Sequence, residues 1–580
     1  MLASAIRGVV AAMPSRAHPS RLPFAFALLL AACPAESVTT PPPEPSDTDT
    51  TKPEPVPDAP ALSVEFLREQ TRILAADEFG GRLPGSEGAR KTVEHIIATM
   101  QAIGLEPAGV DGGWTQPVRM RGVTVDQGAT RVELGSGKGQ AMSMPFGQTW
   151  VGSSFAAGTE QLVDAELVFL GYGVDAPEQQ WNDYARDPKL DMKGKIAVVF
   201  VGDPPLDDGR FGGKAMTYYG RWSYKYEAAL AAGAAGCLVI HESEPASYDW
   251  NVPQTSFSSE RFTVLGRDGE PAPALGMQGW ITAETAETIA KRGGKSLAEW
   301  HELAMKPNFK PIRTKLRLQG KIVTSERIVE DVNVLGRLPG ATQPERAVML
   351  SAHWDHLGTD PKLIAEGKDG IHNGAIDNAS GIATMLGVAA ELHRRAVERP
   401  LDRSVVFLAT TAEEQGLLGS RSWVADPTIA HADVVAVINL DSMNVYGQTK
   451  QLEVVGWGQS TLEDILITLA EGQGRSVVGD SHPEAGSFYR SDHFPFAQVG
   501  IPALYFHSGM EMVEGGLEAG EQIHAEVKAH YHTPADQFDA TWSFAGALQD
   551  AELVLGIVEA VADQSATPKY KPGSEFAGLR

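Results

Sequence analysis

The segment SVVFLATTAEE (404–414) decides the fold class, because it joins a wholly apolar run to a polar end. Such a run is typical of a strand that is covered on both faces, as in parallel sheets. Two similar apolar runs occur at 347–351 and 434–440. A helical pattern lies between them at 380–395. This alternation of strands and helices predicts an α/β protein with a mainly parallel mixed sheet flanked by helices.

Polar side chains follow each of the three apolar runs. In open parallel sheets, ligands bind outside the carboxyl ends of the strands, so these side chains should meet at one edge. They are His353 and Asp355, Glu413 and Glu414, and Asp441. Two further groups lie in predicted loops: Asp377 in GAIDNASG (374–381) and His532 in YHTPAD (531–536).

A metal site is the physical reason to gather such groups. Several carboxylates in one partly dry pocket repel one another unless a cation lies among them. Two histidines with three carboxylates suit a pair of borderline ions such as zinc. Each residue alone has an ordinary alternative role: His353 as a strand-end histidine, Asp377 as a helix cap, Glu413 and Glu414 as a solvated pair, and His532 as a surface residue. Their occurrence together at successive strand ends favours the metal site.

Six motifs carry a resemblance to a known family. They are AHWD (352–355), GAIDNASG (374–381), TTAEEQGLLGS (410–420), NLDS (439–442), RSDHFPFAQVGIPA (490–503) and YHTPAD (531–536). The series resembles the zinc aminopeptidase and glutamate-carboxypeptidase-like family, metallopeptidase family twenty-eight. The resemblance covers roughly 62–125 and 312–562, and it implies a phosphorylase/hydrolase-like zinc exopeptidase fold. The segment between them, with LDMKGKIAVVFVGDPP (190–205), resembles the β-rich protease-associated domain that is commonly inserted there.

The resemblance implies ligands for two zinc ions per chain. Asp377 would bridge the two ions. His353 and Asp441 would complete one site, and Glu414 and His532 would complete the other.

The resemblance also implies the catalytic groups. Glu413 would be the general base, which takes a proton from the attacking water and gives it to the leaving amine. Asp355 would orient the nearest histidine ligand from behind. Tyr531 would steady the tetrahedral intermediate, and Arg490 would contact the substrate. His356 is not needed as a ligand, and we expect it to make a structural hydrogen bond.

These roles predict a two-zinc exopeptidase that removes N-terminal residues from peptides. Among the arginines only Arg490 lies in a site motif, whereas a carboxypeptidase needs arginines to hold a terminal carboxylate. Because Arg210 or Arg221 could reach in from the inserted segment, a glutamate-carboxypeptidase-like activity is the main alternative. A catalytically inactive, receptor-like ectodomain is a second alternative, and the presence of all five ligands and the base argues against it. A glutaminyl cyclase is a third alternative, and the inserted domain argues against it because the cyclases lack that domain.

The composition excludes nucleic acid as a partner. Lys and Arg total 49 against 74 Asp and Glu, and a net charge of −25 repels a polyanion. The expected partners are peptide substrates and, through a lipid anchor, a membrane. Two cysteines, Cys33 and Cys237, are too few for a disulfide framework.

The N-terminus predicts export. Arg16 and Arg21 precede LPFAFALLLAA (22–32), an apolar run that is too short to span a bilayer. The run ends at Cys33 in a pattern that resembles the bacterial lipobox, in which the cysteine is acylated; the alternative is an ordinary cleavage site. We therefore expect a lipoprotein of the bacterial cell envelope that faces the periplasm or the exterior. Pro34 in place of a retention aspartate favours the outer membrane.

The predicted segments follow in a simple order. Residues 34–60 are rich in proline, threonine and acids and bury almost nothing, so they predict a disordered tether. The full order is a signal peptide and lipobox (1–33), the tether (34–60), N-terminal helices of the peptidase domain (62–125), the protease-associated insert (126–311), the zinc peptidase domain (312–565) and a C-terminal tail (566–580).

Overall fold

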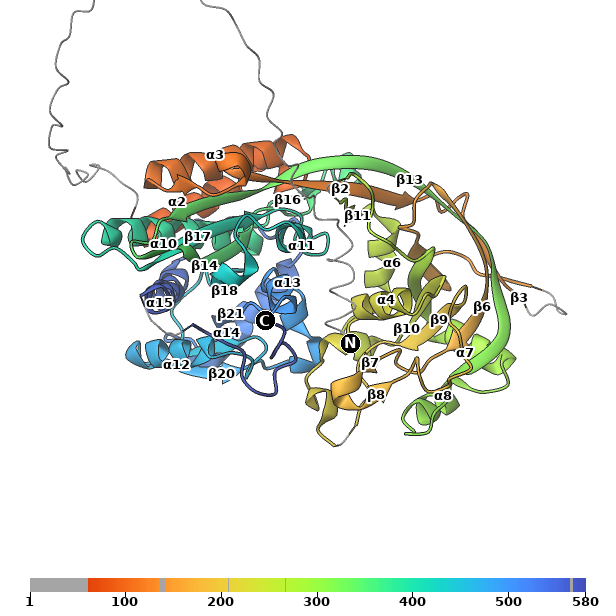
Figure 1. Ribbon diagram of the computed structural model, residues 1–580. Helices are drawn as coiled ribbons and strands as arrows, with labels where there is room; N and C mark the ends of the chain where they lie inside the picture. Colours follow the sequence, from red (N-terminus) through yellow and green to blue (C-terminus); the bar gives the residue numbers. More distant parts are fainter. Residues whose placement is uncertain (1–60, 136–140, 207, 267, 564–566) are drawn as a thin grey trace, which may run out of the picture. The chain divides into compact units, whose positions relative to one another are not determined.

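The computed structural model describes residues 61–135, 141–206, 208–266, 268–563 and 567–580 (Figure 1). The predicted signal peptide, lipobox and tether lie outside these ranges. Within them, no helix combines the length and the hydropathy that crossing a membrane requires.

Two helices open the described chain, where apolar residues recur at helical spacing. α2 spans Val64–Leu74 and α3 spans Glu87–Ile103. The Ser63 hydroxyl accepts a backbone N–H of the first turn of α2, which satisfies a donor that the helix itself leaves free. α3 ends at Gly104, whose φ of 96° lies in the left-handed region that glycine adopts without strain.

Four parallel strands form the centre of the larger sheet (Figure 1). They are β14 (Gln343–His353), β17 (Arg403–Thr410), β18 (Val434–Asn439) and β21 (Ala503–Ser508). Their order is β17-β14-β18-β21. Antiparallel strands pair with the two outer members, namely β13 (Ile312–Leu338) with β17 and β19 (Gln451–Val454) with β21. This mixed, centrally parallel sheet confirms the predicted fold class.

Helices cover both faces of this sheet. They are α10 (Ser380–Ala396) and α15 (Ala545–Ala562) on one face, and α11 (Leu418–Ala425) and α13 (His493–Gln498) on the other. Val348 and Leu350 of β14 pack in the core that contains α10 and α15. Met349, between them, packs in a second core with Trp423 and Phe496. Alternate side chains of one strand thus serve the two faces, as the strand geometry requires.

A second group of strands lies in the chain between β2 (Thr115–Val125) and β13. It comprises β5 (Trp150–Ser153), β6 (Glu160–Phe169), β9 (Ile196–Phe200), β10 (Gly236–His241) and β12 (Met277–Thr282). β6, β9, β10 and β12 run parallel to one another in that order, and β5 pairs antiparallel with β12. Val199, Val239 and Trp280 belong to a hydrophobic core of this group's own. α4 (Trp222–Ala231) packs against β10.

The long strand β13 joins the two groups, as the green arrow of Figure 1 shows. Its first part pairs with β6 and with β3 (Arg131–Gly135), and its later part pairs with β2 and β17. The predicted insert (126–311) therefore begins where β2 ends and stops where β13 starts. Because residues 61–580 form one compact unit, the standing of this segment as a separate domain stays a prediction.

The described C-terminal residues pack against the rest of the chain. The Tyr570 hydroxyl donates to the Ile501 carbonyl at 2.8 Å, and Phe576 is buried. The Tyr489 hydroxyl donates to the Glu575 carboxylate. The predicted tail is thus an integral part of the fold over residues 567–580.

Candidate metal centre

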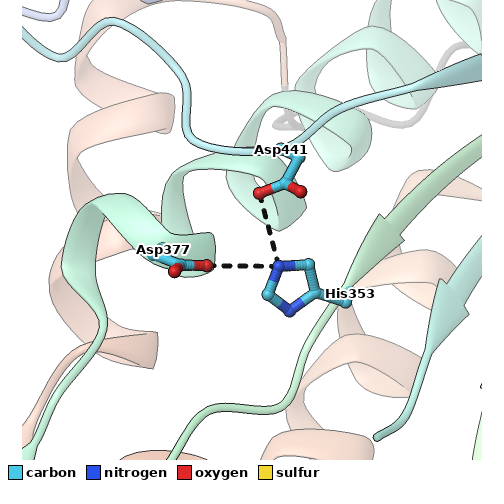
Figure 2. Close-up of side chains that lie close together, drawn as sticks. All are labelled: His353, Asp377 and Asp441. Atoms are coloured by element: carbon cyan, nitrogen blue, oxygen red, sulfur yellow. Dashed lines mark hydrogen bonds and ion pairs between the residues drawn. The ribbon is translucent and has the colours of Figure 1, made fainter. Parts of the chain in front are cut away.

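The ends of three adjacent strands bring the predicted side chains together. His353 is the last residue of β14, Glu413 and Glu414 follow β17, and Asp441 follows β18. β14 lies between β17 and β18 and runs parallel to both, so the three carboxyl ends meet at one edge. Figure 2 shows that His353 faces Asp441 on one side and Asp377 on the other.

Asp377 does not cap the helix that follows it. α10 begins at Ser380, and the side chain that accepts from its first turn is Asn378, whose Oδ1 lies 3.0 Å from the Gly381 nitrogen. The Asp377 carboxylate is instead turned toward two histidines. The capping alternative for Asp377 is therefore wrong, since Ala379 is the N-cap of α10.

The two carboxylate oxygens of Asp377 face different partners. Oδ1 lies 3.2 Å from His353 Nε2, and Oδ2 lies 3.2 Å from His532 Nε2. Asp441 Oδ1 adds a second oxygen 3.4 Å from His353 Nε2, and Glu414 Oε2 adds one 3.1 Å from His532 Nε2. The five residues thus form two groups that share Asp377, in the same division that the resemblance implies.

These spacings suit atoms that share a metal ion. Ligands at 2.0–2.1 Å from a tetrahedral ion lie about 3.3 Å from one another. His532 Nε2 is buried between two carboxylates, and yet it makes no hydrogen bond to any described residue. A nitrogen so placed points its lone pair at a position between the oxygens, where a cation would satisfy all three.

A second histidine also reaches the Glu414 group. His356 Nδ1 donates to Glu414 Oε1 at 2.7 Å, which agrees with the structural hydrogen bond that we expected. Its ligand atom also lies within 4.8 Å of those of Asp377 and Glu414. The chain therefore offers both His356 and His532 to this group, and the choice of His532 stays a prediction.

The electrostatics of the centre demand positive charge. Burial, and then the nearby Asp441 and Glu414, raise the pKa of Glu413 well above its ordinary value. Burial opposes a charge on the histidines, but the carboxylates outweigh it, raising the pKa of His353 well above its ordinary value and that of His532 to about 10. Protons on the histidines thus supply charge that divalent cations would supply more effectively.

Asp355 lies behind the metal ligands and positions three groups. It is fully buried, and its Oδ1 and Oδ2 accept from the backbone nitrogens of Glu413 and Glu414 at 3.0 and 3.4 Å. Its Oδ1 also lies 3.8 Å from His353 Nδ1. Asp355 therefore ties the end of β14 to the end of β17, and its backbone carbonyl, 3.2 Å from His353 Nδ1, is the hydrogen-bond partner of that nitrogen. The role of the Asp355 carboxylate in orienting His353 stays a prediction.

Asp536, which the sequence analysis did not single out, holds the loop of Asp377. It is 4% exposed, and its two oxygens accept from the backbone nitrogens of Ile376 and Asp377 at 2.9 and 3.0 Å. The only signal in the sequence was its place at the end of the YHTPAD motif. Because His532 lies in the same motif, one short segment both contributes a candidate ligand and fixes the loop of another.

Arg82 is the second residue that the sequence analysis missed. Its guanidinium is buried and donates to the carbonyls of Trp354 at 2.8 Å and of Gly374 at 2.9 Å. Burial lowers the pKa of Arg82 to about 10, a shift that Asp536 and Asp377 partly offset, so the side chain stays charged at neutral pH. Arg82 thus places a fixed cation behind the carboxylates and ties the end of β14 to the loop of Asp377.

The candidate ligands lie in the floor of a cleft of about 640 Å³. Glu413, 9% exposed, lines the cleft with them, which rules out the alternative of a solvated acidic pair. Tyr531 is 56% exposed at the cleft and stacks on His532 with ring centroids 3.8 Å apart. Arg490 also lines the cleft. The structure therefore brings Glu413, Tyr531 and Arg490 together with the ligands.

The arginines of the cleft are more numerous than the motifs indicated. Arg221 and Arg261 line the cleft from the segment of the predicted insert, and Arg421 lines it from α11. Arg210 does not line the cleft, and its guanidinium is paired with Asp208 at 2.7 Å. Of the two insert arginines considered from the sequence, only Arg221 reaches the site.

The fold and the site together define an α/β protein with a histidine and carboxylate centre at its strand ends. Residues 333–555 match the family model of Peptidase family M28, so the chain contains a domain of that family. Aminopeptidase YwaD of Bacillus subtilis (strain 168) is 24% identical over 476 residues, which are 80% of this chain and 78% of that protein.

Two solved structures are also similar to this chain. An aminopeptidase from Aneurinibacillus sp. strain AM-1 aligns with 88% of this chain and 95% of its own, at 18% identity and a TM-score of 0.48. A zinc aminopeptidase from Bacillus subtilis aligns with 88% of this chain and 98% of its own, at 20% identity and a TM-score of 0.42.

Proposed function

We propose that the protein is a two-zinc aminopeptidase. The single observation that carries this proposal is the position of the Asp377 carboxylate, which places one oxygen beside His353 and the other beside His532. Asp441 and Glu414 would complete the two ion sites. Zinc ions held there would supply Lewis acidity and would lower the pKa of a water molecule.

Glu413 is the proposed general base. It is buried in the cleft beside the ligands and takes no part in the two ligand groups. Asp355 fixes the backbone of Glu413, so the carboxylate can take a proton from a water in the cleft and deliver it to the leaving amine. Tyr531, at the cleft beside His532, can donate a hydrogen bond to the oxygen of the scissile carbonyl.

The acidic side chains of the cleft support cleavage at the N-terminus of a peptide. Glu413 and Asp441 can hold the α-amine of a substrate, and the similar proteins that are named above are aminopeptidases. The arginines of the cleft favour the second candidate, a carboxypeptidase, because they can grip a terminal carboxylate. An inactive binding ectodomain is disfavoured, since the five candidate ligands and Glu413 share one cleft.

N-terminal acetylation tests the direction of cleavage. We expect kcat/KM for a good peptide to collapse on acetylation, because the acetyl group removes the charge that the carboxylates hold. Chelation should abolish activity, and added zinc should restore it. Continued hydrolysis of the acetylated peptide, with loss on C-terminal amidation, would establish the carboxypeptidase instead.

The Glu413→Gln variant tests the mechanism. It removes the proton acceptor but none of the proposed ligands, so we expect kcat to fall by roughly 10²–10⁴ with zinc content unchanged. Near-normal kcat, or loss of both ions with the fold intact, contradicts the assignment.

We also propose that Cys33 carries a lipid that tethers the protein to the bacterial cell envelope. The support is the sequence alone, since Cys33 lies outside the described residues.

A further inference from the structure

Two arginines meet in the wall of the cleft. The segment before α4, which ends at Arg221, lies against the loop 483–490: the Met216 nitrogen donates to the Pro483 carbonyl at 2.9 Å. The Cδ atom of Arg221 lies 3.4 Å from the position that a Cβ on Gly486 would occupy. Arg490, at the end of the same loop, contributes its charge to the surroundings of Arg221. Both side chains line the cleft that holds the candidate ligands.

Neither arginine has an anionic partner in the part of the chain that the structure describes. No carboxylate oxygen of a described residue lies within 4.0 Å of either guanidinium, and Arg221 Nε is buried without a hydrogen bond. Arg490 donates to the Ala485 carbonyl at 2.7 Å. By contrast, Arg210 of the same chain segment holds Asp208 through two nitrogens. Arg221 and Arg490 thus line the cleft without an anionic partner among the described residues.

The burial of Arg221 and the like charge of Arg490 destabilise this pair of arginines when no anion is bound. Burial, and then the charge of Arg490, lower the pKa of Arg221 to about 10. The other groups that act on Arg221 are the hydroxyls of Tyr218, Tyr248 and Tyr489, which carry no charge at neutral pH. Arg221 is half-buried and Arg490 is exposed, and an anion that accepts from both would relieve the repulsion between their charges.

A third arginine extends the same wall. The Arg261 guanidinium lies 4.5 Å from the Phe257 ring centroid and 5.6 Å from that of Trp222. Its Nη1 donates to the Ser256 hydroxyl at 2.5 Å, and its Nε is buried without a partner among the described residues. The aromatic rings hold this side chain in place, so the wall offers a rigid cationic surface.

We propose that Arg221 and Arg490 bind a carboxylate of the peptide on the leaving side of the scissile bond. The proposal rests on the proposed aminopeptidase activity and names its substrate class. A cleft of about 640 Å³ is in the range that encloses a drug-sized ligand, so the matching substrates are short peptides with a free C-terminus. An acidic side chain next to the scissile bond offers the same chemistry, and the test separates the two.

The test compares matched substrates with the full-length, zinc-loaded protein. The first arm uses the tripeptide Xaa-Gly-Gly, where Xaa is the preferred N-terminal residue, and its C-terminal amide. The second arm uses Xaa-Glu-amide and Xaa-Gln-amide. We expect the free tripeptide to exceed its amide in kcat/KM by about 10–100-fold, mainly through KM, as befits hydrogen bonds to a charged group. A preference of this size confined to the second arm would assign the subsite to an acidic side chain instead.

Variants connect the preference to the arginines. In Arg221→Gln and in Arg490→Gln, the ratio of kcat/KM for the free acid to kcat/KM for the amide should approach one, whatever the absolute rate of either substrate. Arg210→Gln is the matched control and should retain the full ratio. Arg221→Lys should retain part of the preference that Arg221→Gln loses, because lysine keeps the positive charge and lacks the paired N–H donors of the guanidinium.

Equilibrium binding gives a readout that does not depend on turnover. Calorimetry with Glu413→Gln protein should show tighter binding of the free tripeptide than of its amide, and Glu413→Gln/Arg221→Gln protein should not. A wild-type ratio near one in both arms, or a ratio that survives both arginine variants, overturns the subsite. If acetylated peptides are cleaved, the proposed aminopeptidase fails, while the arginine variants still report on the carboxylate contact.

Discussion

Replacing Asp536 by alanine tests whether the loop of Asp377 is held from behind. Asp536 is almost fully buried, and it accepts from the backbone nitrogens of Ile376 and Asp377. Removing the carboxylate leaves both buried N–H groups without a partner, at about 1–3 kcal/mol each, or roughly 2–6 kcal/mol together. Burial raises the pKa of Asp536, so the negative charge itself stabilises the fold little. The two N–H groups that lose their acceptor account for most of the expected loss of stability.

The Asp536→Ala substitution should weaken metal binding as well as lower the stability of the fold. Because Asp377 is the proposed bridge, a loosened loop should weaken both ion sites, and zinc content after dialysis against a mild chelator should fall well below that of the wild type. Urea unfolding, followed by tryptophan fluorescence, measures the loss of stability. Asp539→Ala is the control, because the exposed Asp539 carboxylate accepts, among the described residues, only from Thr541 within its own turn. Wild-type zinc retention together with an unchanged unfolding midpoint would refute the reasoning.

Three further predictions concern the ligands, the anchor and the C-terminal segment. Asp377→Ala should lose both zinc ions and His532→Ala mainly one, as metal analysis per chain will show; two tightly bound ions in Asp377→Ala would exclude a bridge. Cys33→Ser, expressed in a Gram-negative host, should lose detergent partitioning and fatty-acid labelling, and unchanged partitioning would exclude the lipid anchor. Burial raises the pKa of Glu575 from 4.5 to about 7, so the unfolded chain releases this proton first and the free energy of unfolding falls as pH rises through this interval. Glu575→Gln should therefore remove a loss of up to about 3 kcal/mol between pH 5 and pH 8, measured by urea unfolding, whereas Glu518→Gln, on the exposed face of α14 (Gly516–His530), should keep it.

The candidate ligands could be predicted because strand ends are visible in a sequence. An apolar run that stops at a histidine or an acid fixes both the strand and the edge at which its last side chain emerges. β14, β17 and β18 end within two residues of the predicted positions, and parallel pairing then brings His353, Glu414 and Asp441 together. The motif series added the two loop residues, Asp377 and His532, whose approach no local pattern determines.

The supporting groups could not be predicted, because each acts on backbone that is distant in the chain. Arg82 donates to carbonyls near residues 354 and 374, and Asp536 accepts from nitrogens at 376 and 377. A sequence shows a charged residue in a glycine-rich or proline-rich loop, and it does not show which backbone groups that loop will approach. The sequence offered Arg210 and Arg221 equally as arginines that could reach the cleft, since the choice between them depends on the contact between the 216–221 segment and the 483–490 loop.

On the proposed function, the distribution of charge in the cleft would orient a peptide before any reaction occurs. Carboxylates occupy the floor, where Glu413 and Asp441 can receive an α-amine, and the unpaired Arg221 and Arg490 occupy a wall that can receive a carboxylate. A short peptide carries these two charges at its opposite ends, so only one of its two orientations matches both. A longer or amidated peptide keeps the match at the amine and loses it at the arginines. The same geometry that would select the N-terminus for cleavage would therefore also select for chain length, and the comparison of free and amidated tripeptides measures that selection directly.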